Sequence, residues 1–334
     1  MSESPSTGSS TTVQDVHDDT APAERVDYDE FGLFHENIAE FGLDVEVPVV
    51  ERVESAVPSG DDSPPRLVSA LRWGTAPPEV VFVHGGAQNA HTWDTVALAL
   101  GRPAFAVDLP GHGHSGWRAD GAYTPADLAD DVAVAVGEHA RTPVHVVGMS
   151  LGGLTAMMLA RRHPRLVDTL TMVDITPGVN RDKTKAILDF VDGPQAFPSF
   201  DDLLQRTVEF NPTRSESSLR RGILHNARQL PDGSWQWRYD RTNRSDRSSA
   251  MPERDVLAED GGPNPLWDDF AALTCPLMIV RGSLSPVVDD ADVAEATRRQ
   301  PALEYHLVDG AGHSVQGDRP VELAALIDDR LRRH

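Results

Sequence analysis

The feature that most constrains the fold is an alternation that starts at residue 79. Short apolar runs rich in β-branched residues are separated by loops and by segments whose apolar residues have helical spacing. Runs of this length, bounded by Gly or Pro, are typical of buried parallel strands. Strands that alternate with helices predict one doubly wound α/β sheet with helices on both faces. Six runs carry this prediction: EVVFV, PAFAVDL, PVHVVG, TLTMVDI, PLMIVRG and LEYHLVDG. Two further strand candidates precede them, in VEVPVVERVES and RLVSALRWG.

One interval breaks this alternation and divides the chain. Between Pro177 and Cys275 lie 97 residues, far more than a crossover needs, and several stretches among them have helical spacing. We therefore predict a helical cap inserted after the sixth strand. The polar, acidic start of the chain cannot bury enough apolar surface to fold, so we expect it to be disordered. The predicted organisation is a disordered tail over 1–28, a short amphipathic segment over 29–44 that docks on the body, a core over 45–177 and 275–334, and a cap over 178–274.

Charge and composition exclude several classes of function. The net charge is −22, and half of it lies in residues 1–46, where 12 acidic residues accompany only Arg25. This balance argues against a nucleic-acid partner, because phosphate binding relies on clustered Lys and Arg. No apolar stretch is long enough to span a bilayer, and the first residues lack the pattern of a signal peptide, so we expect a cytoplasmic protein without a membrane partner. The single Cys275 cannot form an internal disulfide.

The sequence GMSLG at residues 148–152 fits the G-x-S-x-G pattern of a nucleophile elbow. The glycines allow a turn from strand to helix at which neighbouring side chains would clash, and the turn holds Ser150 out at the edge of the sheet. The helix that follows points its positive end at the reacting centre. The strand-like VHVV before it and the helical LTAMMLA after it favour a catalytic serine over a Gly-rich helix start. We therefore predict that Ser150 is the nucleophile.

A serine nucleophile needs hydrogen-bond donors for the oxyanion and a general base. The HGG sequence at 84–86 follows an earlier strand, and its backbone can face the elbow, so we predict an oxyanion hole made by the N–H groups of Gly86 and Leu151. We expect His84 itself to be structural. The base follows the serine in chain order in this type of fold, and His313 fits because it follows the last predicted strand and precedes the final helix.

These motifs resemble the α/β-hydrolase superfamily over roughly residues 45–334. Four of them occur in the order that is typical of the superfamily: HGG at 84–86, D-x-P-G-x-G-x-S at 108–115, G-x-S-x-G at 148–152 and G-x-G-H at 310–313. The resemblance implies an α/β-hydrolase fold and a serine, acid and histidine triad. The H-x-H spacing of His112 and His114 is compatible with a metal pair, but a Gly-rich turn after a strand accounts for it better. We expect neither a metal nor a cofactor.

The acid of the triad has two candidate positions. The commonest members of the superfamily carry it after the seventh strand, where this chain has Ser285, which cannot hold an imidazolium by charge. Asp289 and Asp290 come shortly after, where they can cap the next helix. Asp174 ends the sixth strand, at the edge of the sheet where catalytic residues converge. Its DITP sequence resembles the D-I-x-P motif of certain small bacterial esterases and mitochondrial serine hydrolases, and the resemblance implies Asp174; Asp289 or Asp290 is the alternative.

Together these residues predict a serine hydrolase that cleaves a small carboxylic ester or thioester through an acyl-enzyme on Ser150. C–C bond hydrolases, lyases and perhydrolases share the motifs, and a non-catalytic receptor for a small ligand could keep the fold. Haloalkane dehalogenases and epoxide hydrolases are disfavoured because they need a carboxylate at the elbow. Aromatic and arginine side chains of the cap are candidates for lining a pocket, but packing of the cap is the simpler interpretation for each.

Overall fold

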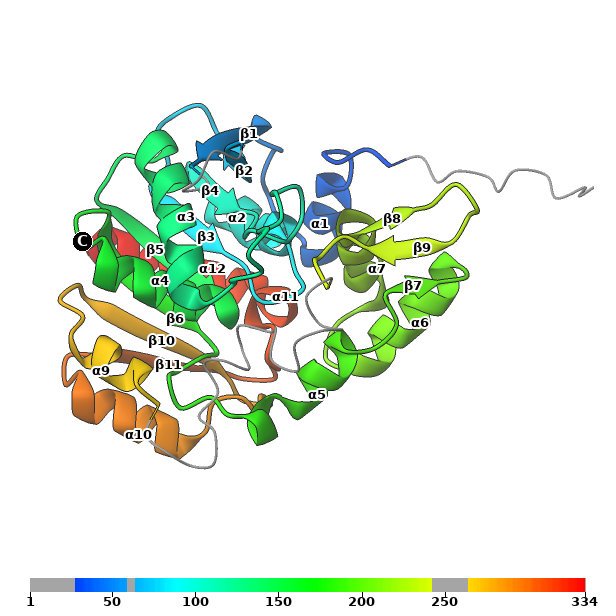
Figure 1. Cartoon of the computed structure of the whole chain (residues 1–334). Helices are drawn as coiled ribbons and strands as arrows, with labels where there is room; N and C mark the ends of the chain where they lie inside the picture. The colour runs from blue at the N-terminus through cyan, green and yellow to red at the C-terminus, as the bar shows by residue number, and fades with distance from the viewer. Residues whose placement is uncertain (1–27, 59–63, 242–263, 334) are drawn as a thin grey trace, which may run out of the picture.

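The computed structural model describes residues 28–58, 64–241 and 264–333 (Figure 1). The predicted tail over 1–28 lies outside the described residues, except for residue 28. The described residues form a central sheet of eight strands in the order β1-β2-β4-β3-β5-β6-β10-β11. Strand β2 pairs antiparallel with both of its neighbours, and the other pairs are parallel. The strands are β1 (Val50–Val57), β2 (Arg66–Trp73), β3 (Val80–Val83), β4 (Ala104–Val107), β5 (Val144–Met149), β6 (Val167–Val173), β10 (Leu277–Gly282) and β11 (Glu304–Val308).

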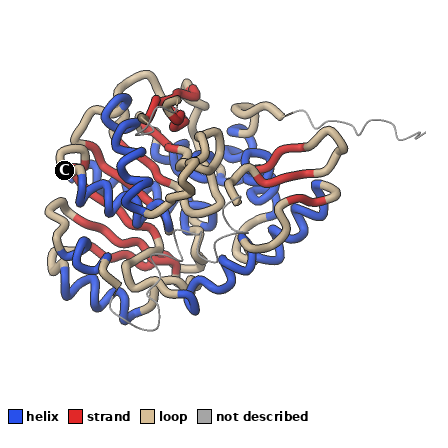
Figure 2. The backbone as a smooth tube through the Cα atoms, in the orientation of Figure 1, coloured by secondary structure: helices blue, strands red, loops and turns tan. Residues whose placement is uncertain are grey.

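Helices cover both faces of this sheet, which confirms the predicted α/β architecture (Figure 2). Along β3, Val81 and Val83 pack into one core cluster, while Val80 and Phe82 pack into the cluster on the opposite face. Both sets are buried, so β3 is a continuous apolar run with no polar alternation. One face carries α3 (Pro125–His139), α4 (Leu151–Arg162), α9 (Leu266–Ala271) and α10 (Asp290–Arg299). The other carries the 3₁₀ helix η1 (Ala90–Trp93), α2 (Asp94–Leu100), α11 (Val315–Asp318) and α12 (Pro320–Arg333).

The amphipathic segment before the sheet forms helix α1 (Phe34–Phe41). Phe34 is 1% exposed, and its ring lies 4.8 Å from that of Trp73, centroid to centroid. The helix ends at Gly42, which has a left-handed φ of 59°. Its apolar side therefore docks on the core, as its spacing indicates.

Between β6 and residue 241, the described part of the cap contains helices and a second sheet. The helices are α5 (Arg181–Val191), α6 (Phe200–Phe210) and α7 (Glu216–Asn226), on the right-hand side of Figure 1. Strands β7 (Ala196–Phe197), β8 (Ala227–Gln229) and β9 (Trp235–Trp237) form a small antiparallel sheet that the sequence pattern does not predict. Strands of two or three residues are too short for their periodicity to be recognised. Trp235, Trp237 and Tyr239 are buried in the cap's own apolar cluster.

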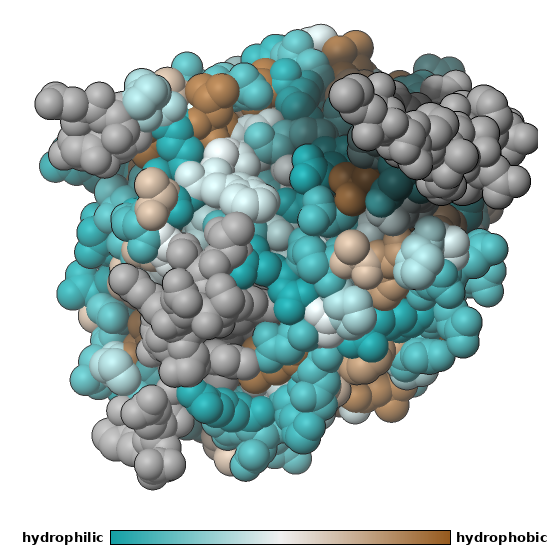
Figure 3. All heavy atoms as spheres, turned by 45° about the vertical axis from the view of Figure 1, so that its right-hand side comes forward, coloured by the Kyte–Doolittle hydropathy of each residue, from teal (hydrophilic) through white to brown (hydrophobic). Residues whose placement is uncertain are grey.

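No helix in the described ranges is long and apolar enough to cross a membrane. The face shown in Figure 3 is mostly hydrophilic, and its apolar residues occur in separate patches.

Candidate active site

Ser150 lies at the turn between β5 and α4, with a left-handed φ of 52°. Two neighbouring glycines make this turn possible. A Cβ at Gly152 would lie 2.3 Å from the carbonyl oxygens of Val83 and His84, and one at Gly148 would lie 2.2 Å from the carbonyl oxygen of Gly152. Contacts this short exclude any side chain, so the GMSLG pattern follows from the geometry. The Ser150 side chain lines a cavity that is described below, although the residue is only 7% exposed.

A continuous chain of hydrogen bonds links Ser150, His313 and Asp174. The Nε2 atom of His313 lies 3.1 Å from Ser150 Oγ, and its Nδ1 atom lies 2.7 Å from Asp174 Oδ2. Asp174 follows β6, and His313 lies in the loop between β11 and α11. These loops meet at the carboxyl ends of the strands, where a doubly wound sheet gathers its functional groups. The structure therefore brings the three sequence-predicted side chains together.

The carboxylate of Asp174 is fully buried and has two further donors. The backbone N–H of Gly282 donates to Oδ1 at 3.0 Å, and the Ser285 hydroxyl donates to Oδ2. Ser285 stands at the position where the commoner pattern has its acid. Here it lies in the loop after the neighbouring strand β10 and hydrogen-bonds to Asp174. Sequence reasoning identifies Ser285 only as a missing carboxylate. The signal for its actual contact is the pairing of β6 with β10, which places the two loops side by side.

The alternative acids lie elsewhere. Asp289 is the N-cap of α10: its Oδ1 accepts from the Asp292 N–H at 2.9 Å, in a reciprocal capping box. Asp290 is fully exposed and pairs with Arg281 at 2.6 Å. Neither carboxylate is within hydrogen-bond distance of His313, whose ring nitrogens contact Asp174 and Ser150. Asp289 therefore caps a helix, the role that its spacing allows, and Asp290 lies in the first turn of the same helix.

Leu151 follows the serine directly, and Gly86 lies in the HGG loop. Gly86 lines the same cavity as Ser150, and a Cβ at the preceding Gly85 would lie 3.3 Å from Ser150 Cβ, so the HGG loop touches the elbow. Within the described ranges, neither the Gly86 nor the Leu151 backbone N–H donates a hydrogen bond. Two free donors beside a serine are what an oxyanion requires.

The other histidines of these loops hold the backbone in place. His84 is fully buried; its Nε2 accepts from the Leu109 N–H at 2.9 Å, so its Nδ1 carries the proton and donates to the Gly85 carbonyl at 2.8 Å. Burial, with His112 nearby, lowers the pKa of His84 to about 3. His112 accepts at Nε2 from the N–H of Ala87, a residue with φ of 57°. These rings brace the HGG loop, as expected for His84.

A cavity of about 340 Å³ opens at Ser150 and His313, between the core and the cap. Much of its wall is apolar, including Ile187 and Phe190 of α5, Phe210 of α6 and Leu284 after β10. Lys183 and Arg214 supply its positive charges. An apolar cavity with a few polar groups at one end suits a small organic ester.

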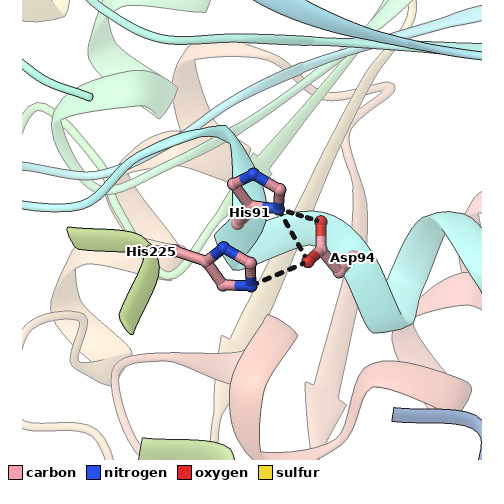
Figure 4. A group of neighbouring side chains, drawn as sticks. All are labelled: His91, Asp94 and His225. Carbon is pink, nitrogen blue, oxygen red and sulfur yellow. Dashed lines mark hydrogen bonds and ion pairs between the residues drawn. The ribbon is translucent and has the colours of Figure 1, made fainter. Parts of the chain in front are cut away.

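A second cluster of titratable groups lies nearby, formed by His91, Asp94 and His225 (Figure 4). It is the one group of potential metal ligands found among the described residues. The two imidazole rings are stacked, with centroids 3.7 Å apart and planes 7° from parallel. A metal ion binds in the plane of an imidazole, and one ion cannot lie in two parallel planes that are separated by a ring stack. This arrangement does not fit a metal ion held by both histidines. It suits a proton held between His91 and Asp94 instead.

Comparisons with known proteins agree with this geometry. A family model described as the alpha/beta hydrolase family matches residues 80–326. The esterase Rv0045c of Mycobacterium tuberculosis is 42% identical over 306 residues, which cover 90% of this chain and 94% of that protein. A solved structure of that esterase has a TM-score of 0.76 and covers 92% of this chain and 100% of its own.

A more distant relative extends the comparison. The 2-(acetamidomethylene)succinate hydrolase of Mesorhizobium japonicum is 27% identical and covers 76% of this chain and 88% of its own length. A crystal structure titled as E-2-(acetamidomethylene)succinate hydrolase has 25% sequence identity and a TM-score of 0.71, covering 84% of this chain and 98% of its own.

Proposed function

The chain belongs to the alpha/beta hydrolase family and is a carboxylic ester hydrolase; from this premise we propose that Ser150, His313 and Asp174 are its catalytic triad. The observation that supports the proposal most directly is the hydrogen-bond chain from Ser150 Oγ through His313 to Asp174. The alternatives for the acid have other contacts: Asp289 caps α10, and Asp290 pairs with Arg281.

The first half of the reaction acylates the serine. Asp174 accepts the hydrogen bond from Nδ1–H of His313, which leaves Nε2 free to take the proton of the Ser150 hydroxyl. The hydroxyl oxygen then attacks the ester carbonyl, and the N–H groups of Gly86 and Leu151 hold the developing oxyanion. The protonated His313 returns the proton to the leaving alcohol, and the acyl group stays on Ser150.

The second half releases the acid. A water molecule attacks the acyl carbonyl, and His313 takes one of its protons as general base. Collapse of the second tetrahedral intermediate breaks the bond to Ser150 Oγ, and His313 returns the proton to the serine. Every step uses groups of this chain and one water molecule. We therefore still predict that the reaction needs neither a metal nor a cofactor.

For the substrate we propose a chemical class and no single compound. The similar Mycobacterium tuberculosis protein is named an esterase, so a small-molecule ester is the first substrate class, with thioesters next. The triad alone does not separate ester hydrolysis from C–C bond cleavage, lyase chemistry, perhydrolysis or a receptor role, but the identity to a protein named an esterase favours ester hydrolysis over all of them. A cytoplasmic location likewise stays a prediction from the sequence.

Covalent labelling tests the proposal. A fluorophosphonate probe should label the wild-type protein, and labelling should disappear in Ser150→Ala. Ser314→Ala is the matched control, because Ser314 lines the same cavity without joining the hydrogen-bond chain. The control should label like the wild type. Absence of labelling in the wild-type protein would contradict the serine-hydrolase mechanism.

A further inference from the structure

The cavity at Ser150 continues into a second, smaller cavity of about 130 Å³. The second cavity extends between α1, α7 and the loop before η1, and its wall is more polar. The residues that line both cavities mark the place where they join: Ala87, Gln88, Phe190, Asn211, Arg214 and Ser314. Arg214 is the one charged residue in this shared wall.

Contacts place Arg214 beside the turn that follows the catalytic histidine. Arg214 lies in the loop between α6 and α7. A Cβ at Gly317 of α11 would lie 2.7 Å from the Cζ and Nε atoms of Arg214, so the absent side chain leaves room for the guanidinium. A Cβ at Gly312 would similarly lie 3.1 Å from Thr213 Oγ1. The Thr213 and Arg214 loop therefore packs on the residues that flank His313.

Arg214 differs from the other cations of these cavities in having no carboxylate partner among the described residues. Lys183 pairs with Asp292 at 2.6 Å and with Asp289 at 2.9 Å, and Arg221 pairs with Glu40. Arg214 donates from Nη2 to Ser218 Oγ at 2.7 Å, and its buried Nε has no hydrogen-bond partner in the described part of the chain. No described carboxylate lies within 4.0 Å of its guanidinium.

The surroundings of Arg214 leave its charge poorly compensated. Burial lowers the pKa of Arg214, as does the charge of Arg221, and the more distant carboxylates of Asp318 and Glu40 oppose them. Asp318 uses Oδ2 to accept the Gly312 N–H at 2.7 Å. Enclosed donors and charges without partners are costly for a folded protein. Such a group is retained at little cost if a ligand supplies the missing anion.

We propose that Arg214 binds a carboxylate of the substrate, so that the preferred substrates are esters whose acyl or alcohol part carries a carboxylate. The planar guanidinium presents parallel donors that match the two oxygens of a carboxylate. The inference rests on the proposed esterase function of Ser150. It adds to that function a substrate class that the triad alone does not specify.

Matched esters test this inference. On the acyl side, p-nitrophenyl hexanoate is compared with mono-p-nitrophenyl adipate, which has the same six carbons and a terminal carboxylate; monoesters from succinate to suberate vary the length. On the alcohol side, phenyl hexanoate is compared with 4-carboxyphenyl hexanoate. We expect the wild-type protein to prefer the charged member of at least one pair about tenfold or more in kcat/KM, because a buried polar site rejects a ligand that leaves it unpaired.

Variants then identify the residue responsible. Arg214→Gln should reduce the charged-to-neutral ratio of kcat/KM about tenfold or more, mainly through KM of the charged ester, and Arg214→Lys should retain part of the preference. Arg220→Gln is the control: Arg220 lies on the same helix as Arg221, is about half exposed and lines neither cavity. Its ratio should equal that of the wild type.

Each contrary outcome is decisive. An unchanged ratio in Arg214→Gln overturns the inference, and so does a wild-type protein that prefers the neutral member of every pair, whether or not the variants fold. If the wild-type protein cleaves no ester and takes no fluorophosphonate label, the proposed function fails separately. Calorimetric binding of adipate to Ser150→Ala, with and without Arg214→Gln, then decides the role of Arg214: a loss of affinity in the double variant supports it, and equal affinities overturn it.

Discussion

At the scale of single residues, the carboxylate of Asp174 combines burial with three hydrogen-bond donors, from His313, Gly282 and Ser285. Three donors on one buried carboxylate fix both its position and its orientation. Asp174 also has a left-handed φ of 51°, and the two other non-glycine residues with positive φ in the described chain are Ala87 and Ser150. All three lie at the candidate site. Backbone strain concentrated there is typical of a site whose geometry is held by its surroundings.

The acid assignment is tested by two isosteric changes. Asp174→Asn should lower kcat on a p-nitrophenyl ester by about 10³ to 10⁴, because the amide cannot stabilise the imidazolium and favours the wrong tautomer. Asp289→Asn should keep the wild-type kcat, since asparagine also caps a helix. Steady-state kinetics measures both. A wild-type kcat in Asp174→Asn would show that another group orients His313.

The position of Ser285 permits a rescue experiment. Its hydroxyl contacts Asp174 Oδ2, the oxygen that also accepts from His313 Nδ1, so a carboxylate at residue 285 would lie near that nitrogen. We expect Asp174→Asn/Ser285→Asp to be at least about tenfold more active than Asp174→Asn, because it returns a negative charge to the imidazolium. Measurement of kcat/KM for both variants tests this. A double variant no more active than Asp174→Asn would mean that a carboxylate at residue 285, after β10, does not reach His313.

At the scale of elements, α1 connects the core to the cap. Its Phe34 packs on Trp73 of β2, and its Asn37 donates to Thr95 of α2 at 3.1 Å. On its other side, Glu40 pairs with Arg221 of α7. Asn37 also lines the smaller cavity, so the segment forms part of the wall near the candidate site. The apolar spacing predicts docking, but charged residues with several possible partners do not reveal which element they will meet.

Removing the Phe34 ring should weaken this connection. Phe34→Ala should reduce the free energy of unfolding by about 3–5 kcal/mol, because it deletes a buried aromatic side chain and leaves a cavity against Trp73. His35→Ala is the control, since His35 is exposed on the same helix, and its effect should stay within about 0.5 kcal/mol. Urea denaturation measures both. A Phe34→Ala protein as stable as the control would mean that α1 docks without contributing to stability.

At the scale of the whole molecule, the alternation of strands and helices was sufficient to predict the sheet, because a strand buried on both faces is recognisable as an apolar run. The chain order of Ser150, Asp174 and His313 predicted side chains that the structure brings together, because the carboxyl ends of parallel strands share one edge. The sequence does not predict Arg214, because its significance depends on two cavities meeting and on no carboxylate of the described ranges lying close to it, which no local pattern records.

The cluster around His91 was equally unpredictable, because it joins three distant parts of the chain. His91 Nδ1 lies 2.9 Å from Asp94 of the core, and its Nε2 lies 3.1 Å from Glu30 of the N-terminal segment. His91 stacks on His225 of the cap, whose Nδ1 lies 2.7 Å from the Tyr28 hydroxyl. Burial of His225, beside His91, lowers its pKa well below the usual value, so His225 is neutral while His91 holds the proton.

The proton on His91 should make stability depend on pH. Burial alone would lower the pKa of His91, but the charge of Asp94 and the hydrogen bonds that His91 donates to Asp94 and Glu30 raise it from 6.5 to about 9. Burial raises the pKa of Asp94 too, so above pH 9 a desolvated carboxylate loses its partner. Because the folded pKa of His91 lies above the unfolded one, its contribution is complete below pH 6.5 and disappears as the pH rises through 9. His225 titrates in the opposite sense, and its contribution is lost only below pH 6.5.

Urea denaturation between pH 6.5 and 9 tests this dependence. The shift of the His91 pKa corresponds to about 3 kcal/mol of unfolding free energy, which the wild-type protein should lose across this range relative to His91→Gln. His35→Gln, at an exposed histidine on α1, should follow the wild type at every pH. The glutamine variant cannot release this proton, so its stability should change less with pH even if it is lower throughout. Parallel curves for the wild type and His91→Gln would show that the three segments are held together without a buried imidazolium.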